Sequence, residues 1–391
     1  RNLYAALLMP VVFSTCRILS RLRFMKSISA VFLYVLIILA GCSSPDANEQ
    51  QGFVSDWPRS VTYEIFIQSF YDSNGDGIGD FNGMTQKLDY LEDLGVGGIW
   101  LMPMMPSPSY HKYDVTDYRS THPDYGTMDD FKAFVAEAHE RNIKVVIDLV
   151  VNHTGIDHPW FIDSKSGPDS EYRDYYVWRK RNDILEEIEK KEVSLDSDNI
   201  TQWHEAEGNE ELYYGFFYGG MPDLNYDNPR VREEIFTIGK FWLKDVGVDG
   251  FRLDAAKHIY PDDRPGDNHQ FWIEFRQEME SVKPGVYLVG EIWSDAETVA
   301  PYLKGLPAAF NFDFGYAIEK AVMEGKDDGL VSKYKKISEY YQSVTTEFID
   351  ATFLKNHDQN RILSVLEEDE SKAKLTAALL LTMPGSPYLY Y

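Results

Sequence analysis

Carboxylate, histidine and basic side chains follow four apolar runs of this chain, at the points where the runs end. The runs lie in DLVVNHT, GFRLDAAKH, GEIW and FLKNHDQNR, and the polar residues are Asp148, Asn152, His153, Arg252, Asp254, Lys257, His258, Glu291, His357 and Asp358. One such group at a strand end is usually structural. Buried charge is costly unless function retains it, so three carboxylates on three runs, one of them two residues after an arginine, predict a catalytic site.

A second acidic motif, DSNGDGIGD, places oxygen ligands at alternate positions. Its candidate metal ligands are Asp72, Asn74, Asp76, the Ile78 carbonyl and Asp80. Such a set suits a hard cation, Ca²⁺ above all. An EF-hand also needs a glutamate at the twelfth position, which is Gly83 here, and a preceding helix, whereas VTYEIFIQSF in front predicts a strand. The motif therefore predicts either a calcium-binding loop after a strand or a metal-free acidic turn.

Eight apolar runs are expected to form the strands that position these residues. They are 61–70, 97–103, 144–152, 250–255, 287–293, 309–314, 351–356 and 387–391. Amphipathic stretches separate them, among them MTQKLDYLEDLG, MDDFKAFVAEAHERN and PRVREEIFTIGKFWLKDVG, several ending in Gly or Asn as helices do. Repeated βα units predict a parallel sheet, and eight of them predict a closed barrel. A doubly wound sheet is the alternative, but no dinucleotide-binding glycine pattern follows the first strand.

The third and fourth predicted strands are too far apart for a structureless loop. We expect a small inserted domain at 154–225, with RKRNDILEEIEKKEVS as a charged helical run on a solvated face. The barrel then comprises 57–153 and 226–391, and it is incomplete because the sequence stops on the last strand, at PGSPYLYY. A final barrel helix and a C-terminal β-sandwich are expected to be missing.

In combination, these motifs resemble those of the α-amylase family, glycoside hydrolase family 13, from about Trp57 to the end of the chain. The resemblance implies that Asp254 is the nucleophile, Glu291 the general acid and then base, and Asp358 the carboxylate that engages sugar hydroxyls. Retaining glycosidases need two carboxyl groups about 5 Å apart, one ionised and one protonated. We expect Arg252 to hold Asp254 ionised and neighbouring carboxylates to raise the pKa of Glu291.

The resemblance also implies binding roles for several other residues. His153 and His357 are similar to the family's sugar-binding histidines, Tyr113 to its stacking platform, and Asp148 to the partner of the arginine. Lys257 and His258 match a pair on the leaving-group side, whereas His111 is either a sugar contact or a loop hydrogen bond. In many relatives a loop similar to DSNGDGIGD binds a structural Ca²⁺, which favours calcium as the cofactor.

Two short signals concern specificity. MPDLN, Met221 to Asn225, resembles the signature of a group intermediate between oligo-1,6-glucosidases and neopullulanases. The members of this intermediate group are mostly bacterial α-amylases. Valine after the nucleophile tends to mark α-1,6 specificity in relatives, and here Ala255 follows Asp254. The resemblance thus implies endo-type, retaining hydrolysis of α-1,4 bonds in starch, glycogen or maltooligosaccharides. The alternatives are an α-glucosidase or oligo-1,6-glucosidase, a transglycosylase, a non-catalytic glucan-binding protein and a calcium-binding adhesin.

The overall composition narrows the class of partner. The formal net charge of the 391 residues is −25, which argues against a nucleic-acid partner and for a neutral or cationic ligand. Aromatic residues make up 14% of the chain, which suits stacking on sugars as well as a large core. We expect a monomer that acts on an α-glucan.

The N-terminal part is expected to be either a cleaved targeting signal or an uncleaved membrane anchor. MKSISAVFLYVLIILAGCSS, from Met25, has a basic start, a short apolar run and LAGC ending at Cys42, and it resembles a bacterial lipoprotein signal. In that interpretation residues 1–24 are an upstream or leader segment, 25–42 the signal, Cys42 the lipidated residue and 43–56 a flexible tether. The protein would then lie in the cell envelope, periplasmic or on the outer surface, with the lipid as its membrane contact.

Overall fold

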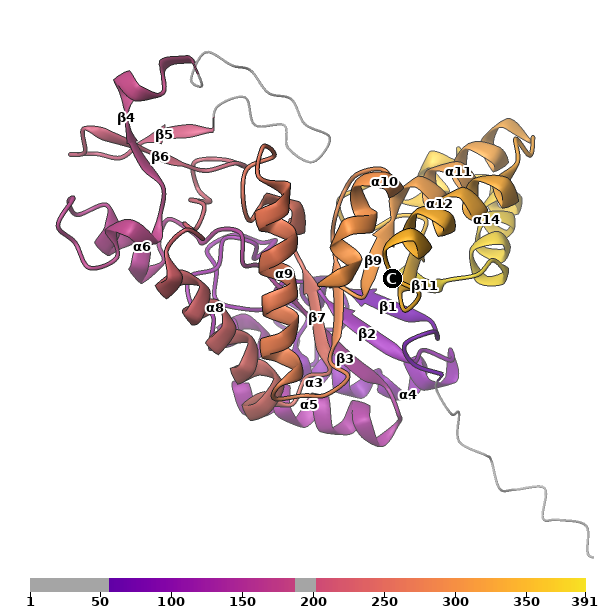
Figure 1. The fold of residues 1–391 in the computed structure, drawn as a ribbon. Helices are drawn as coiled ribbons and strands as arrows, with labels where there is room; N and C mark the ends of the chain where they lie inside the picture. The colour runs from indigo at the N-terminus through magenta and orange to yellow at the C-terminus, as the bar shows by residue number, and fades with distance from the viewer. Residues whose placement is uncertain (1–55, 187–201) are drawn as a thin grey trace, which may run out of the picture. The chain divides into compact units, whose positions relative to one another are not determined.

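Eight short parallel strands close into a barrel in the order β1-β11-β10-β9-β8-β7-β3-β2 (Figure 1). The strands are Thr62–Ile65 (β1), Gly98–Leu101 (β2), Lys144–Leu149 (β3), Gly250–Leu253 (β7), Tyr287–Gly290 (β8), Ala308–Asn311 (β9), Ile349–Phe353 (β10) and Ser386–Tyr390 (β11). The predicted (β/α)8 fold class is confirmed. The sixth predicted strand is too long at its end, because Asn311 already caps a helix that begins at Phe312.

The computed structural model describes residues 56–186 and 202–391, which belong to a compact unit from Phe53 to Tyr391. The predicted leader, signal, lipidated Cys42 and most of the tether lie outside the described residues. Within the described ranges, the helices are all too short or too polar to cross a membrane.

Strand register places polar residues of different strands at matching levels of the barrel. Asp148 of β3 pairs with Arg252 of β7, and Glu64 of β1 pairs with Trp100 of β2. Successive side chains of a strand point to opposite faces. An interior cluster of large apolar side chains, which includes Trp100, Phe310, Phe353 and Tyr388, fills the barrel, and a second, larger core lies between the strands and the helices.

The helices around the barrel differ in length, and several begin with a side-chain N-cap. They are Phe81–Gln86 (α3), Leu88–Asp93 (α4), Met128–Glu140 (α5), Pro229–Phe241 (α8), Pro265–Glu280 (α9), Ala296–Val299 (α10), Phe312–Glu324 (α11), Leu330–Val344 (α12), Ile362–Val365 (α13) and Glu370–Thr382 (α14). Thr127 and Asp130 form a reciprocal capping box at the start of α5. Figure 1 shows α9 between α8 and β7, and α9 contacts α8.

Two predicted helices differ in detail from the structure. MTQKLDYLEDLG does not form one helix, because the helix is interrupted at Lys87, between α3 and α4. PRVREEIFTIGKFWLKDVG begins with α8 as predicted, but its last turn, Trp242–Val246, is π-helical and ends at Gly247 with φ of 96°. Glycine adopts this left-handed backbone without strain, as the C-cap prediction required.

Between β3 and α8 the chain forms an antiparallel sheet of its own within the range predicted for the inserted domain. Its strands are Trp178–Lys180 (β4), Trp203–Glu205 (β5) and Glu211–Tyr214 (β6), in the order β4-β6-β5, with the helix Pro159–Ser164 (α6) before them. The predicted charged helix is wrong at its start, since Arg179 and Lys180 belong to β4, where they pair with β6. Backbone bonds such as Leu224 N–H to Asn152 O tie the segment to the barrel.

Candidate active site

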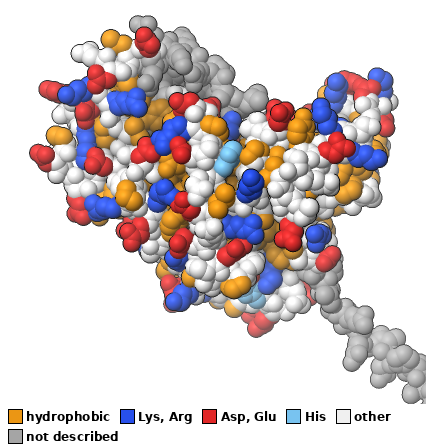
Figure 2. Space-filling model, viewed as in Figure 1, with side chains coloured by type: hydrophobic (Ala, Val, Ile, Leu, Met, Phe, Trp, Pro, Cys, Tyr) orange, Lys and Arg blue, Asp and Glu red, His pale blue; other side chains and the backbone are white. Residues whose placement is uncertain are grey.

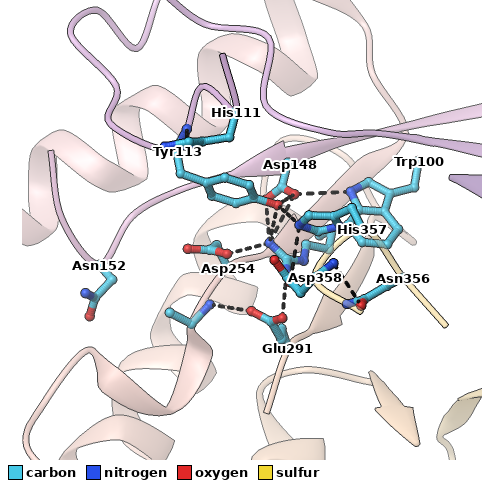
Figure 3. A network of polar contacts seen from close by, with 12 residues as sticks. Trp100, His111, Tyr113, Asp148, Asn152, Asp254, Glu291, Asn356, His357 and Asp358 are labelled. Carbon is cyan, nitrogen blue, oxygen red and sulfur yellow. Dashed lines mark hydrogen bonds and ion pairs between the residues drawn. The ribbon is translucent and has the colours of Figure 1, made fainter. Parts of the chain in front are cut away.

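The guanidinium group of Arg252 forms ion pairs with three carboxylates at the carboxyl ends of the strands. Figure 3 shows these carboxylates, Asp148, Asp254 and Glu291, grouped together. The Nη1 of Arg252 lies 3.0 Å from both carboxylate oxygens of Asp148 and 2.5 Å from Oδ1 of Asp254. Its Nη2 lies 2.7 Å from Oε1 of Glu291. The Arg252 side chain is 1% exposed, so one fully buried cation joins three carboxylates from three neighbouring strand ends.

Asp148 is held in place from several sides. Besides the arginine, it accepts hydrogen bonds from the Tyr113 hydroxyl at 3.1 Å and from the indole N–H of Trp100 at 3.3 Å. Its side chain is completely buried. Asp148 is thus paired with Arg252, as predicted. It is more deeply buried than Asp254 and Glu291, which remain partly open.

The chain turns sharply after the candidate nucleophile. Strand β7 ends at Leu253, and Ala255 adopts the left-handed conformation with φ of 46° and ψ of 41°. This backbone costs a residue with a Cβ about 1–2 kcal/mol. The turn directs the Ala255 N–H to Oε2 of Glu291 at 3.2 Å, so the loop after Asp254 also orients Glu291.

Burial sets the protonation of the two candidate catalytic carboxyl groups. It raises the pKa of Asp254 to about 6 and that of Glu291 to about 7, and Arg252 opposes the increase in both. The charges of Asp254 and Asp358 raise the pKa of Glu291 further. The expected order, with Glu291 the weaker acid, is present. The expected cause was incomplete, because loss of solvent outweighs both the arginine and the neighbouring carboxylates.

Asp358 and His357 reach the cluster from the loop after β10. The Asp358 side chain is 42% exposed, the most open of the three candidate carboxylates, and one of its oxygens lies 3.3 Å from Nε2 of His357. The His357 ring stacks on Tyr113, with centroids 5.5 Å apart and planes at 12°. The structure thus brings both residues beside the predicted stacking platform.

His153, the other predicted sugar-binding histidine, is buried and neutral. His153 lies close to Tyr113, with its Nε2 3.2 Å from the Tyr113 carbonyl oxygen and its Nδ1 3.3 Å from Nδ2 of Asn152. Burial lowers its pKa to about 4, so the ring is neutral, donates from Nε2 and accepts at Nδ1. Both ring nitrogens of His153 thus bond to loop residues around the site, Tyr113 and Asn152.

His111 and the pair after Asp254 lie at the periphery. The Nδ1 of His111 accepts a hydrogen bond from the Tyr113 backbone N–H at 3.1 Å, and the two rings are 6.0 Å apart, which agrees with the loop alternative for this residue. Lys257 and His258 form the short 3-10 turn Ala256–His258. His258 stacks on Phe216 of the inserted segment, with centroids 4.0 Å apart.

The acidic loop after β1 is organised by its own hydrogen bonds. Asp72 accepts from the backbone N–H groups of Asn74, Gly75 and Gly77, and Asp80 caps α3 by accepting from Gly83. The donor types, all oxygen, fit calcium. The three carboxylates are not gathered, however: the described part of the chain contains no cluster of three Asp, Glu, His or Cys side chains that could hold a metal.

The sequence prediction missed two residues of the network. Trp100 contacts both Asp148 and Arg252, the guanidinium carbon lying 5.1 Å from its ring centre. Glu64 bonds the His357 ring at 2.6 Å. A signal for Glu64 was available, since it is a lone carboxylate inside the apolar run VTYEIFIQSF. A tryptophan in a buried strand carries no comparable signal.

Comparison with known proteins agrees with this arrangement. The family model for the α-amylase catalytic domain matches residues 64–391. The chain belongs to the α-amylase family. It is therefore a glycoside hydrolase of that family, as its motifs predicted, and its barrel is the family's catalytic domain.

Named relatives cover more than one activity. The chain is 44% identical over 372 residues to α-amylase 3 of Dictyoglomus thermophilum, covering 95% of this chain and 70% of that protein. It is 37% identical to a 4-α-glucanotransferase of Thermotoga neapolitana, covering 85% and 70%. Among solved structures, an α-amylase from H. orenii superposes with a TM-score of 0.79 at 50% identity, covering 85% of this chain and 68% of that one.

Proposed function

We propose that the protein hydrolyses α-1,4-glucosidic bonds of starch, glycogen or maltooligosaccharides within the chain and with retention of configuration. The observation that carries the retaining mechanism is the position of Asp254 and Glu291 on the two nitrogens of one guanidinium group, and similarity to α-amylases supports the choice of bond. Such an arrangement favours the separation of about 5 Å found in retaining enzymes over the wider spacing that accommodates a water molecule in inverting ones.

In the first step Asp254 attacks the anomeric carbon while Glu291 protonates the departing glycosidic oxygen, which leaves a glucosyl ester on Asp254. In the second step Glu291, now ionised, takes a proton from water, and the water oxygen displaces Asp254. Both residues return to their initial protonation states. Arg252 and Asp148 hold the nucleophile in place, and Asp358 is the open carboxylate that accepts from sugar hydroxyls.

A neutral glucan suits the surface as well as the site. Acidic and basic side chains are intermixed over the face shown in Figure 2. Tyr113 offers a ring for stacking on a sugar beside Asp254 and Asp358, and similarity to an α-amylase and a 4-α-glucanotransferase supports an α-glucan as substrate.

Product analysis tests the proposal. Soluble starch should lose its iodine colour faster than reducing ends accumulate, because internal bonds are cut, whereas isomaltooligosaccharides should stay intact. Release of glucose alone, or cleavage of α-1,6 bonds, would replace the proposal with an α-glucosidase or oligo-1,6-glucosidase. Products longer than a maltotriose substrate would make the transferase reaction the main one.

The pH dependence of kcat/KM should be a narrow bell. Asp254 must be ionised and Glu291 protonated, so activity should rise through a pKa of about 6 and fall through one of about 7. Rates with a dilute maltooligosaccharide between pH 4 and 9 measure this. With an activated aryl maltooligosaccharide, Glu291→Gln should flatten the alkaline limb. An unchanged limb in that variant would assign the alkaline pKa to another group.

We also propose that Ca²⁺ draws together the oxygen atoms of the loop from Asp72 to Asp80, whose carboxylates are not clustered in the structure, and so stabilises the loop. Removal of calcium with EDTA should lower the melting temperature by roughly 5 °C, since a ligand that binds only the folded state stabilises it by about 2–4 kcal/mol at saturation. The variant Asp72→Asn/Asp76→Asn should lose this response. Metal analysis should show that EDTA has removed calcium from a calcium-loaded sample. An unchanged melting temperature after that removal would contradict the proposal.

For the N-terminal segment, we propose a lipoprotein anchored through Cys42 in the cell envelope. The LAGC motif after a short apolar run is the support. Mass spectrometry of the protein from membranes should show a diacylglyceryl group on Cys42, and Cys42→Ala should shift the protein to the soluble fraction.

A further inference from the structure

Glu64 is a buried carboxylate outside the predicted catalytic set. It lies within β1, and its side chain is 2% exposed. Its Oε1 is 2.6 Å from Nδ1 of His357 and 3.4 Å from the His357 backbone nitrogen. A buried charge without a partner costs several kcal/mol, so this carboxylate and this ring are built as a pair.

Hydrogen-bond directions determine the protons on the His357 ring. Nδ1 faces the carboxylate of Glu64, which only accepts, so Nδ1 carries a hydrogen. Nε2 lies 3.3 Å from Oδ2 of Asp358, which only accepts, and 2.6 Å from the Tyr113 hydroxyl. The Tyr113 hydroxyl has a second acceptor, Oδ2 of Asp148 at 3.1 Å, to which it can direct its single hydrogen. With that hydrogen on Asp148, Nε2 donates to Tyr113 and Asp358. Both ring nitrogens thus face oxygens that accept, an arrangement that favours the imidazolium.

Burial acts against charge on both members of the pair. It raises the pKa of Glu64, and the hydrogen bond and charge of His357 together with the charge of Arg252 oppose that increase. Burial lowers the pKa of His357, but the hydrogen bond and charge of Glu64 together with the charge of Asp358 outweigh burial and raise it to about 9, while Arg252 opposes them. The other titratable groups that face the pair are Tyr113, Asp148, His111, Tyr388 and Tyr390. The neutral His153, nearby, has no carboxylate on its ring.

We propose that Glu64 is a positioning residue that keeps His357 doubly protonated, with its Nε2–H available to a sugar hydroxyl beside Tyr113 and Asp358. The proposal rests on the proposed function, because it assigns the glucose ring to that position. Without the charge of Glu64, His357 would become neutral near pH 7 and present either a lone pair or a weaker donor to the sugar. Glu64 acts through His357 and does not itself touch the substrate.

Imidazole nitrogen NMR on the substrate-free protein tests this directly. With ¹⁵N-labelled histidine, and the signal assigned by its loss in His357→Asn, His357 should remain an imidazolium up to about pH 8 or higher. In Glu64→Gln its proton affinity should fall at least about tenfold, whereas Glu64→Asp should keep most of it. His153 should stay neutral in all of them and serves as the internal control. A wild-type His357 that titrates at or below pH 6.5, or the same pKa in Glu64→Gln, would overturn the proposal.

Two further measurements separate positioning from structure. A merely structural Glu64 would change the melting temperature without moving the His357 pKa, whereas a positioning role also lowers kcat at pH 8 more than at pH 6 in Glu64→Gln. If Glu64→Gln does not fold, the wild-type titration and Glu64→Asp decide the question. Because the NMR needs no substrate, its failure leaves the hydrolase proposal intact, and absence of starch hydrolysis leaves the protonation result intact.

Discussion

Asp254→Asn should reduce starch hydrolysis roughly 10⁴-fold or more while the protein stays folded. The amide occupies the same space but cannot form the glucosyl ester, and Arg252 keeps its ion pairs with Asp148 and Glu291. Reducing-sugar release at saturating starch measures the loss, and circular dichroism with a melting curve confirms folding.

The matched control for this variant is Asp93→Asn. Asp93 is an exposed carboxylate at the end of α4, far along the chain from the strand-end motifs, and should leave activity unchanged. A loss of less than about tenfold in Asp254→Asn would show that another group attacks the anomeric carbon. The nucleophile would then have to be sought between Glu291 and Asp358.

Arg252→Met should have the largest effect on stability. The guanidinium contacts Asp148, Asp254 and Glu291, and removing one partner of a buried charge pair typically costs about 3–5 kcal/mol. Urea unfolding measures the difference. Activity at pH 7 should also fall, because Asp254 loses its ion pair with Arg252 and its pKa rises further.

The stability loss in Arg252→Met should depend on pH in a definite direction. The folded-state pKa values of Asp254 and Glu291 are already raised to about 6 and about 7, so folding is favoured below these values and weakened as pH rises through them. Without the arginine the loss should be larger at pH 8 than at pH 5.5. As a control, Arg264→Met removes surface ion pairs to Asp227 and Asp267 and should cost at most about 1 kcal/mol. Equal effects of the two substitutions would contradict the central role of Arg252.

The barrel could be predicted from sequence because its strands are compact apolar runs separated by amphipathic stretches. The ends of elements could not. Lys87 ends α3 although the helical periodicity of the sequence continues past it. Asn311 ends β9 because its side chain caps the helix that follows. Arg179 and Lys180 form part of β4 because they pair with β6. This pairing outweighs the helix propensity of the charged run that they begin.

The candidate site could be predicted as a set of residues but not as a network. The strand-end pattern identified Asp254, Glu291 and Asp358, since parallel strands bring their carboxyl ends to one side. The link from Glu64 to His357 spans 293 positions and decides the protonation of the ring, which residue types alone do not reveal. Likewise, the burial that raises the pKa of Glu291 depends on packing.

The anomeric configuration of the first product tests the central claim most directly. Proton NMR during the first minutes of maltooligosaccharide hydrolysis distinguishes the α from the β anomer before mutarotation mixes them. Double displacement through Asp254 predicts that the α anomer appears first and the β anomer grows in later. Initial release of the β anomer would mean that water attacks directly, and the assignment of Asp254 as a covalent nucleophile would be wrong.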